Sequence, residues 1–326
     1  MTTVAELGTS FNLPNYRGRV IQLTPSDTPL TSILMGTAPG GGQVSTSRTF
    51  EWQTYSLRNA GQNVKPDGDR TGTPQHRARA NVFNVLQTHR EDVDLAYEKL
   101  AQIGQFDGQN ISGPNPVVNE EAWQIDQMWK QIKRDIEFSA INGSYTLPAN
   151  NGQNAATRGL REAITTNVID NGEVERPVSL NVLNNAMQSA WDNGGLQESE
   201  MGTVVVNSVQ KRWLTDALKS QQGGGTEPRD RMVAGVSVET IQTDFGVLNV
   251  MLNRYMPQDE IMIVSLDQCQ PWFRFIPGKG IMFAEPTAKV GASNATQLYC
   301  SFGLEYGNEA AHALITDLPD TAPVDA

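Results

Sequence analysis

The sequence predicts an α+β protein, in which runs of strands and runs of helices occupy separate stretches of the chain. Three observations support this class: a strand, loop and strand pattern from Thr49 to Asp94, a long amphipathic helix that ends near Asn142, and a mixed block of helices and strands followed by further strands. Such segregation is typical of α+β folds. The chain has 326 residues, so it is long enough for about two domains with a substantial core.

The N-terminal stretch, residues 1–45, is rich in Thr, Ser, Gly and Pro and contains only short apolar runs, such as Val20–Leu23 and Ile33–Met35. A triple glycine, Gly40–Gly42, stands just before the first predicted strand. This composition is typical of a linker. We expect an extended arm here, without a domain of its own.

The next feature is a long two-stranded ribbon. Its two arms, Thr49–Leu57 and Asn81–Thr88, carry β-branched and aromatic residues with partial period-two alternation. The segment between them, Arg58–Ala80, holds glycines, two prolines and charges but few apolar residues, so it predicts a projecting loop. An isolated ribbon is only marginally stable in water. We therefore expect it to rest on a neighbouring surface, as in a protein that works within an assembly.

The loop of this ribbon is basic although the protein is acidic. The whole chain has a net charge of -11, and the segment from Arg58 to Arg79 has a net charge of +3, which leaves -14 for the rest. A basic loop on an acidic body suits docking onto another copy of the chain, whereas the alternative interpretation is a loop that is merely solvated. The predicted inter-subunit contacts are Arg58, Lys65, Arg70, Arg77 and Arg79.

After a mixed connection with a short helix at Ala96–Leu100, the clearest helix is predicted over Val117–Asn142. Its apolar positions step alternately by four and three residues, which places them along one face. Asp126 with Lys130 and Lys133 with Glu137 are expected to pair on its surface. Fewer than four heptads favour packing under a sheet over the rival, a coiled coil. The predicted core of this helix is Ile125, Trp129, Ile132 and Ile136.

The remainder of the chain predicts a mixed block that ends in strands. Ser179 and Asn207 are suited to begin helices that extend to Asn193 and to Leu218, and glycines stop the first of these. A flexible loop is expected up to Arg231, and the acidic tail from Asp317 is expected to be loose. The predicted strands are Thr203–Val206, a hairpin of Val236–Ile241 and Val247–Leu252, Glu260–Leu266, Gln297–Tyr306 and Ala311–Ile315.

No catalytic, cofactor or metal site is predicted. The sequence lacks a phosphate-binding loop, a zinc-protease motif, a nucleophile elbow and a cysteine pair at metal spacing. His76 and His89 read as solvated or salt-bridged residues, and the Glu120–Glu121 pair reads as a complement to the helix dipole. Cys269 and Cys300 read as buried thiols. The absence of these motifs from the sequence favours a structural role.

Charge and hydropathy exclude further classes. An acidic chain lacks the clustered Lys and Arg that grip nucleic acid. No apolar run is long enough for a membrane span, and the N-terminus lacks the basic and apolar regions of a secretory signal. We expect the protein to be made in the cytoplasm and to have no membrane partner.

Six short segments give the chain a resemblance to the major capsid proteins of tailed bacteriophages, the family with the Hong Kong 97-type fold. They occur in the family's order and together span most of the chain. The segments are Ser26–Leu30, Thr157–Leu160, Thr243–Gly246, Asn253–Pro257, Ala284–Lys289 and Asn308–His312.

The resemblance implies a layout in five parts. The ribbon would be the family's extended E-loop, and the long helix would be the spine helix of a peripheral domain. The expected parts are an N-terminal arm at 1–45, the E-loop ribbon at 46–94, the peripheral domain with the spine helix at 95–160, an axial domain at 161–270, and return strands of the peripheral domain with the tail at 271–326.

The resemblance also implies the function and the partners. The protein would be a structural component of the virion that self-assembles into hexamers and pentamers, which form an icosahedral head around double-stranded DNA without reading its sequence. Scaffold, portal and decoration proteins become candidate partners. Two alternatives come from other classes: a tail-tube or baseplate protein, which would not need the long helix, and an enzyme whose site has no recognised signature.

Overall fold

The structure is a computed structural model that describes residues 21–37, 41–68, 76–101, 119–150, 152–170, 175–196, 202–221, 229–233, 236–243, 245–289 and 291–323. The chain divides into two compact units. Unit 1 comprises Met1–Asp27, Arg90–Ile132 and Phe283–Tyr299, and unit 2 comprises Thr28–His89, Lys133–Met282 and Cys300–Ala326.

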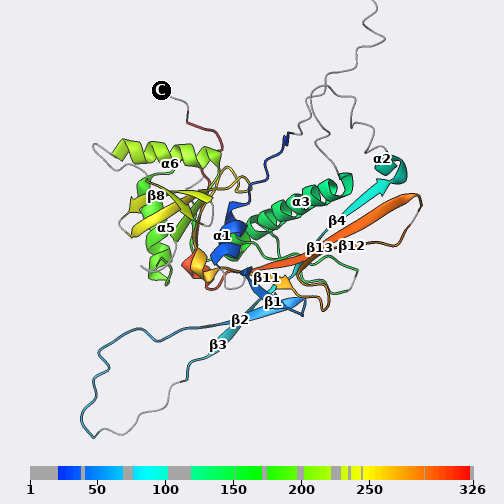
Figure 1. Ribbon diagram of the computed structural model, residues 1–326. Coiled ribbons are helices and arrows are strands. Elements are labelled where there is room, and N and C mark those ends of the chain that lie inside the picture. The colour runs from blue at the N-terminus through cyan, green and yellow to red at the C-terminus, as the bar shows by residue number, and fades with distance from the viewer. Residues whose placement is uncertain are drawn as a thin grey trace, which may run out of the picture. The chain divides into compact units, whose positions relative to one another are not determined.

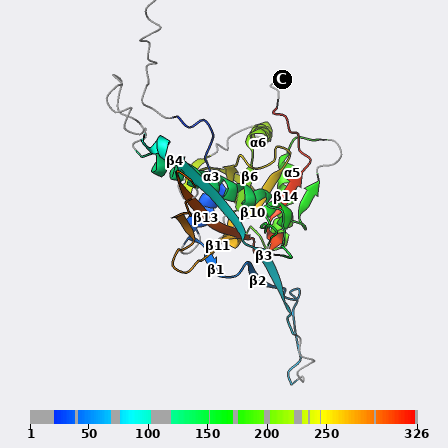
Figure 2. The same ribbon diagram turned by 90° about the vertical axis from the view of Figure 1, so that its right-hand side faces the viewer.

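Unit 2 contains a seven-stranded mixed sheet. Its order is β5 (Val168–Asp170), β14 (Ala313–Thr316), β10 (Ile261–Ser265), β6 (Gly202–Val206), β9 (Gly246–Leu252), β8 (Val236–Thr243) and β7 (Arg229–Val233). The central strands β6 and β10 are buried along their whole length, which matches their continuous apolar sequences. Figure 2 labels β6, β10 and β14, which are neighbours in this order.

Two helices, α5 (Leu180–Asp192) and α6 (Ser208–Gln221), pack against this sheet (Figure 1). The predicted caps are confirmed: the Ser179 side chain accepts a hydrogen bond from Val182 N, and Asn207 Oδ1 accepts from Gln210 N at 2.9 Å. The shared core of helices and strands includes Leu183, Met187, Leu214, Val204 and Ile263. The predicted hairpin is confirmed as β8 and β9.

A second sheet has the order β1 (Gln43–Ser45), β11 (Gln270–Arg274), β13 (Ser293–Glu305) and β12 (Met282–Pro286), and β4 (Gln87–Ala96) also pairs with β13. Several strands here escaped the sequence analysis. β11 and β12 were not predicted, and neither were β5 and β7. The loop expected up to Arg231 is wrong at β7, because Arg229–Val233 pairs antiparallel with β8.

The N-terminal stretch is not extended throughout. Residues 1–20 and 38–40 lie outside the described part, but Pro29–Thr37 forms helix α1. Leu30, Ile33 and Leu34 of α1 are buried, because their spacing of three and four residues places them on one face. The expectation of an extended arm is therefore wrong for these nine residues.

The long helix α3 extends over Glu120–Asn142, and residues 117–118 of its predicted range lie outside the described part. Gly143 follows it at a crowded place, where a Cβ would lie 2.4 Å from Ser139 O and 2.5 Å from Thr157 O. The predicted ion pair of Asp126 with Lys130 is confirmed at 2.7 Å.

The second predicted pair on α3 is wrong. Glu137 is buried, so its carboxylate does not meet Lys133 at the surface. It accepts hydrogen bonds from Leu30 N and Thr31 N, both at 2.8 Å, from Thr31 Oγ1, and from Asn253 Nδ2 at 2.5 Å. A carboxylate thus closes the N-terminus of α1, where the first amides of a helix have no partner inside the helix.

Unit 1 contains the end of β4, α2 (Tyr97–Ala101), the first half of α3, and the adjoining ends of β12 and β13. The predicted short helix is confirmed as α2. Tyr97 N donates to Ala292 O at 3.1 Å, and the Lys289 ammonium lies 5.6 Å from the centre of the Tyr97 ring. Phe283 and Tyr299 stack with ring centres 5.3 Å apart.

Candidate functional site

The predicted ribbon is confirmed as strands β2 (Thr49–Tyr55) and β3 (Arg79–Val85), which pair antiparallel from Thr49 opposite Val85 to Tyr55 opposite Arg79. The two strands form a sheet of their own. In Figure 1 the ribbon and its loop extend away from β1 and β11 of the same unit. The returning arm ends earlier than predicted, because the chain leaves β3 at Val85 and continues as the separate strand β4 from Gln87.

The ribbon is packed at its root and exposed toward its loop. Along β2, Phe50 is buried and Trp52 is half-buried, whereas Tyr55 is 67% exposed. Phe50 lies against Gly303, where a Cβ would come within 2.5 Å of the Phe50 ring. Only a residue without a side chain fits beneath this ring, so Gly303 allows the root to seat closely.

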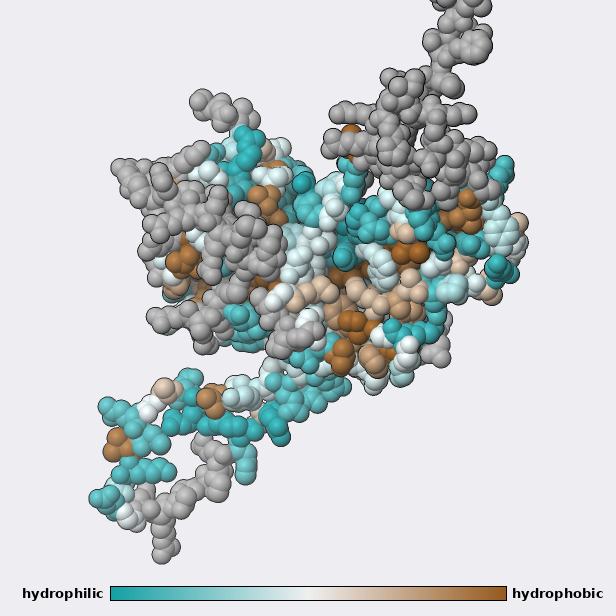
Figure 3. All heavy atoms as spheres, viewed as in Figure 1, coloured by the Kyte–Doolittle hydropathy of each residue, from teal (hydrophilic) through white to brown (hydrophobic). Residues whose placement is uncertain are grey.

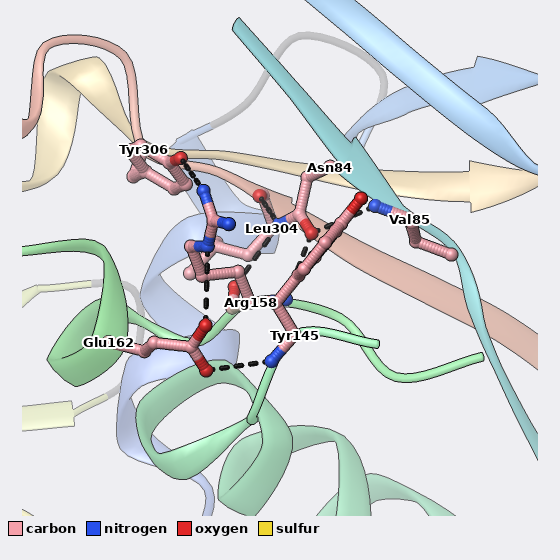
Figure 4. A network of polar contacts seen from close by, with 7 residues as sticks. All are labelled: Asn84, Val85, Tyr145, Arg158, Glu162, Leu304 and Tyr306. Carbon is pink, nitrogen blue, oxygen red and sulfur yellow. Dashed lines mark hydrogen bonds and ion pairs between the residues drawn. The ribbon is translucent and has the colours of Figure 1, made fainter. Parts of the chain in front are cut away.

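Asn84 fastens β3 to two other segments (Figure 4). Its side-chain nitrogen donates to Leu304 O at 2.7 Å and to Arg158 O at 3.1 Å. Its side-chain oxygen accepts from Val85 N at 2.8 Å and from Arg158 N at 2.9 Å. This fully buried amide therefore has both of its donors and its acceptor in use.

Arg158 connects the two sides of the root (Figure 4). Its Nη1 donates to the Tyr306 hydroxyl at 3.1 Å, and its Nε lies 3.5 Å from the Glu162 carboxylate. The guanidinium lies 4.5 Å from the centre of the Tyr145 ring. Although burial opposes the charge of Arg158, its contacts with Tyr306 and Glu162 raise its pKa, so this side chain is a permanent cation.

Aromatic contacts extend this cluster onto both strands. Trp52 of β2 meets Tyr306 edge to face at 4.9 Å and donates from Nε1 to Gly307 O at 2.9 Å. Phe83 of β3 meets Tyr145 at 6.1 Å. We call Trp52, Phe83, Asn84, Arg158 and Tyr306 the root clasp. It holds each strand of the ribbon by a separate aromatic contact. Hydrogen bonds of Asn84 also hold β3, and those of Trp52 hold β2.

Four of the five predicted basic contacts lie in the described part of the ribbon and its loop. Arg58, Lys65 and Arg77 lie in the loop, and Arg79 is the first residue of β3. All four are exposed, and Arg70 lies outside the described residues. None of the four forms an ion pair with an acidic residue of the described chain. Figure 3 shows mainly hydrophilic colouring over the described part of the ribbon and its loop. Their contact with another subunit stays a prediction.

The four predicted core positions of α3 differ in burial. Ile132 and Ile136 are buried, whereas Ile125 and Trp129 are half-buried.

His89 and the two cysteines are buried. The expectation that His89 is solvated or salt-bridged is wrong: it is buried, its Nε2 has no hydrogen-bond partner, and burial lowers its pKa to about 4. Cys269 and Cys300 are confirmed as free, buried thiols, and burial raises the pKa of Cys300 to about 12. In the part of the chain that is described, no group of side chains is placed to hold a metal ion, and no helix could cross a membrane.

Sequence patterns predicted neither the root clasp nor the burial of Glu137 against the N-terminus of α1. One signal for Asn84 was present, since it interrupts the apolar run Val82–Leu86 at a position that faces inward in the ribbon. Arg158 and Leu304 lie 74 and 220 residues from Asn84 along the chain, and Tyr306 lies 148 residues from Arg158. Local patterns do not show contacts at these separations.

Comparison with known proteins identifies the group to which this architecture belongs. The family model described as SU10 major capsid protein matches residues 2–319. Among curated proteins, none matches this chain by sequence.

Solved structures share the whole architecture. The cyanophage A-1(L) capsid asymmetric unit has a TM-score of 0.63 at 11% identity, and the match covers 96% of this chain and 99% of that one. The SrpI encapsulin of Synechococcus elongatus PCC 7942 has a TM-score of 0.60 at 10% identity, with coverage of 100% and 99%. The capsid of Myoviridae phage XM1 has a TM-score of 0.58 at 13% identity, with coverage of 94% and 97%. These likenesses establish the fold, which is of the Hong Kong 97 type.

Proposed function

Because the chain belongs to the SU10 major capsid protein family, we propose that it assembles into hexamers and pentamers, which close into an icosahedral head around double-stranded phage DNA. A major capsid protein is a structural protein and not an enzyme. The family therefore confirms the predicted structural role. Assembly into hexamers and pentamers is our proposal.

The observation that carries the proposal is the ribbon. Its outer part exposes Tyr55, the last residue of β2, and Leu57 in the loop, at 67% and 73%. Within the described residues the two strands of the ribbon pair with no third strand. Such a ribbon gains stability when it lies on another surface. Its root is nevertheless fixed by the root clasp, so the ribbon enters an interface with its direction already set. Preorganisation of this kind reduces the entropy lost on association.

The family's layout provides the proposed roles of the parts. The ribbon would be the E-loop that lies over the adjacent subunit, and α3 would be the spine helix of the peripheral domain. The seven-stranded sheet with α5 and α6 would form most of the axial domain. In this arrangement each subunit makes several weak contacts, which become stable together once the shell closes.

The charge distribution supports a container for DNA. The chain outside the basic loop has a net charge of -14, so it repels phosphate at short range and does not grip it. We propose that the packaged DNA is enclosed without sequence-specific contacts, and that the mature protein resides in the virion.

The experiment that tests this proposal is expression of the full chain, followed by sedimentation and negative-stain electron microscopy. We expect closed polyhedral particles, or capsomers with five or six subunits that convert to particles at higher protein concentration. Tubes, stacked rings or a stable monomer at every concentration would contradict the proposal.

A further inference from the structure

An open groove of about 950 Å³ lies at the root of the ribbon. Ribbon residues line it, including Trp52, Tyr55 and Arg79. Glu305, the last residue of β13, lines it together with Gly307 and Asn308 of the turn that follows. The groove therefore adjoins the root clasp, of which Trp52 is a member.

Among the described residues that line the groove, Glu305 is acidic and Arg79 of β3 is basic, and the two form no ion pair. The Glu305 carboxylate accepts one hydrogen bond, from Trp272 Nε1 at 2.5 Å, and within the described residues no basic side chain forms an ion pair with it. Burial raises its pKa, because a carboxylate that is partly removed from water and lacks a cation is destabilised. A cation placed beside it would be stabilised and would restore the charged form.

The aromatic wall suits the same kind of occupant. Trp52 and Tyr55 both line the groove. Aromatic faces attract the charged groups of Arg and Lys side chains and also pack against the apolar stems of these side chains. The groove thus combines a carboxylate with aromatic rings, which fits a basic side chain on an extended segment.

We propose that the groove receives the basic loop of a second copy of this chain, in which Arg58, Lys65 or Arg77 pairs with Glu305. This proposal rests on the proposed function, because it specifies where the ribbon docks in the shell. The charges are complementary, since the loop carries an excess of basic residues and Arg58, Lys65 and Arg77 have no acidic partner in the described chain.

The loop and the groove lie on the same molecule, so their contact joins different surfaces of two copies. A projecting loop and a receiving groove form a head-to-tail contact, in which each subunit donates to one neighbour and receives from another. Such a contact generates a ring when the rotation between neighbours closes. A five- or sixfold capsomer requires a contact of this kind.

The test begins with charge reversal in the full chain. Glu305→Lys should lower the yield of shells at least about tenfold, because like charges would then meet at each contact. The matched control is Glu51→Lys, which makes the same change at an exposed position of β2 that does not line the groove. The control should give normal shells. Circular dichroism of the unassembled subunits should be unchanged in both variants.

The decisive experiment tests whether a swapped charge pair restores the yield of shells. Glu305→Lys is combined in turn with Arg58→Glu, Lys65→Glu and Arg77→Glu, and one combination should restore the yield to within about threefold of the parent. Since a loop substitution cannot repair a folding defect at the root, restoration would establish the contact. If no combination restores shells, the groove assignment is overturned.

A milder variant covers the case in which Lys at position 305 prevents folding. Glu305→Gln keeps an oxygen that accepts from Trp272 and removes only the charge, so it should fold, lower the shell yield and weaken its dependence on salt. Normal shells from Glu305→Gln with unchanged salt dependence would overturn the assignment and leave the proposed function standing. Failure of the parent chain to form shells would instead overturn the proposed function.

Discussion

At Asn84 one side chain determines how the ribbon leaves the subunit. Its amide bonds to backbone groups of Val85, Arg158 and Leu304, which belong to three different segments. No other residue type has the same pair of donors and acceptor in so small a volume. Shortening this side chain leaves several buried backbone groups without a partner.

We therefore predict that Asn84→Ala lowers the free energy of unfolding by about 1–3 kcal/mol. Asn81→Ala, on the exposed part of the same strand, should change it by less than about 0.5 kcal/mol. Urea unfolding of the unassembled subunits would measure both. An equal effect of the two substitutions would show that the hydrogen bonds of Asn84 do not stabilise the root.

His89 provides a second prediction at this scale, on pH. Its pKa lies at about 4 in the folded chain and near 6.5 in the unfolded chain. Between these values the unfolded chain binds the proton and the folded chain does not, so stability falls as the pH is lowered through this window. At pH 5 this residue should cost about 2 kcal/mol relative to pH 7.

His89→Gln should remove this contribution, so the variant should lose less stability than the parent between pH 7 and pH 5. The comparison is made by denaturant unfolding at both pH values, where other titrating groups contribute equally to the two proteins. Parallel losses would mean that His89 accepts its proton in the folded chain as readily as in the unfolded chain.

At the scale of elements, α3 shows that positions on one apolar face of a helix can differ in burial. Its apolar stripe continues along the whole helix, but Ile136 is 3% exposed whereas Ile125 is only half-buried. Sequence spacing shows which positions share a face, and it does not show how much of that face another element covers.

Two matched substitutions test this difference. Ile136→Ala should lower the free energy of unfolding of the unassembled subunit by about 2–5 kcal/mol, because it leaves a cavity. Ile125→Ala should cost less than about half as much, because the half-buried side chain loses fewer contacts. Equal losses in thermal or urea unfolding would contradict the observed burial.

The elements that the sequence predicted share strong local signals. The helices α5 and α6 have capping residues, and β8 with β9 has a tight turn at Gly246, where φ is +115°. The missed helix α1 has only nine residues and depends on Glu137, which lies more than 100 residues away along the chain. Likewise β11 contains Pro271 and owes its place to pairing with β1 and β13. Such long-range support leaves no local trace.

At the scale of the whole molecule, the ribbon was predictable and its attachment was not. Two alternating apolar segments around a polar loop identify a projecting ribbon, and the charge of that loop predicts, without a test so far, an acidic partner surface. The root clasp is assembled from segments that meet only in the fold. The groove beside Glu305 likewise combines β2, the start of β3 and the turn after β13.

The charge of the loop leads to a prediction about assembly. Arg77→Glu together with Arg79→Glu changes the net charge of segment 58–79 from +3 to -1, so the loop would repel an acidic neighbour. Both residues are exposed, and the subunit should fold with an unchanged melting temperature. We expect few closed shells at low ionic strength and partial recovery at higher salt, measured by sedimentation. A lowered melting temperature of the subunit would indicate a role of these residues in folding.

The most direct measurement is a cryo-electron microscopy reconstruction of the particles formed by the unaltered chain. We expect five- and sixfold capsomers in a closed shell. In this shell the density of each ribbon should lie over the adjacent subunit, and its loop should enter the groove beside Glu305. A shell in which the ribbons point away from neighbouring subunits, or an assembly of open tubes, would contradict this expectation.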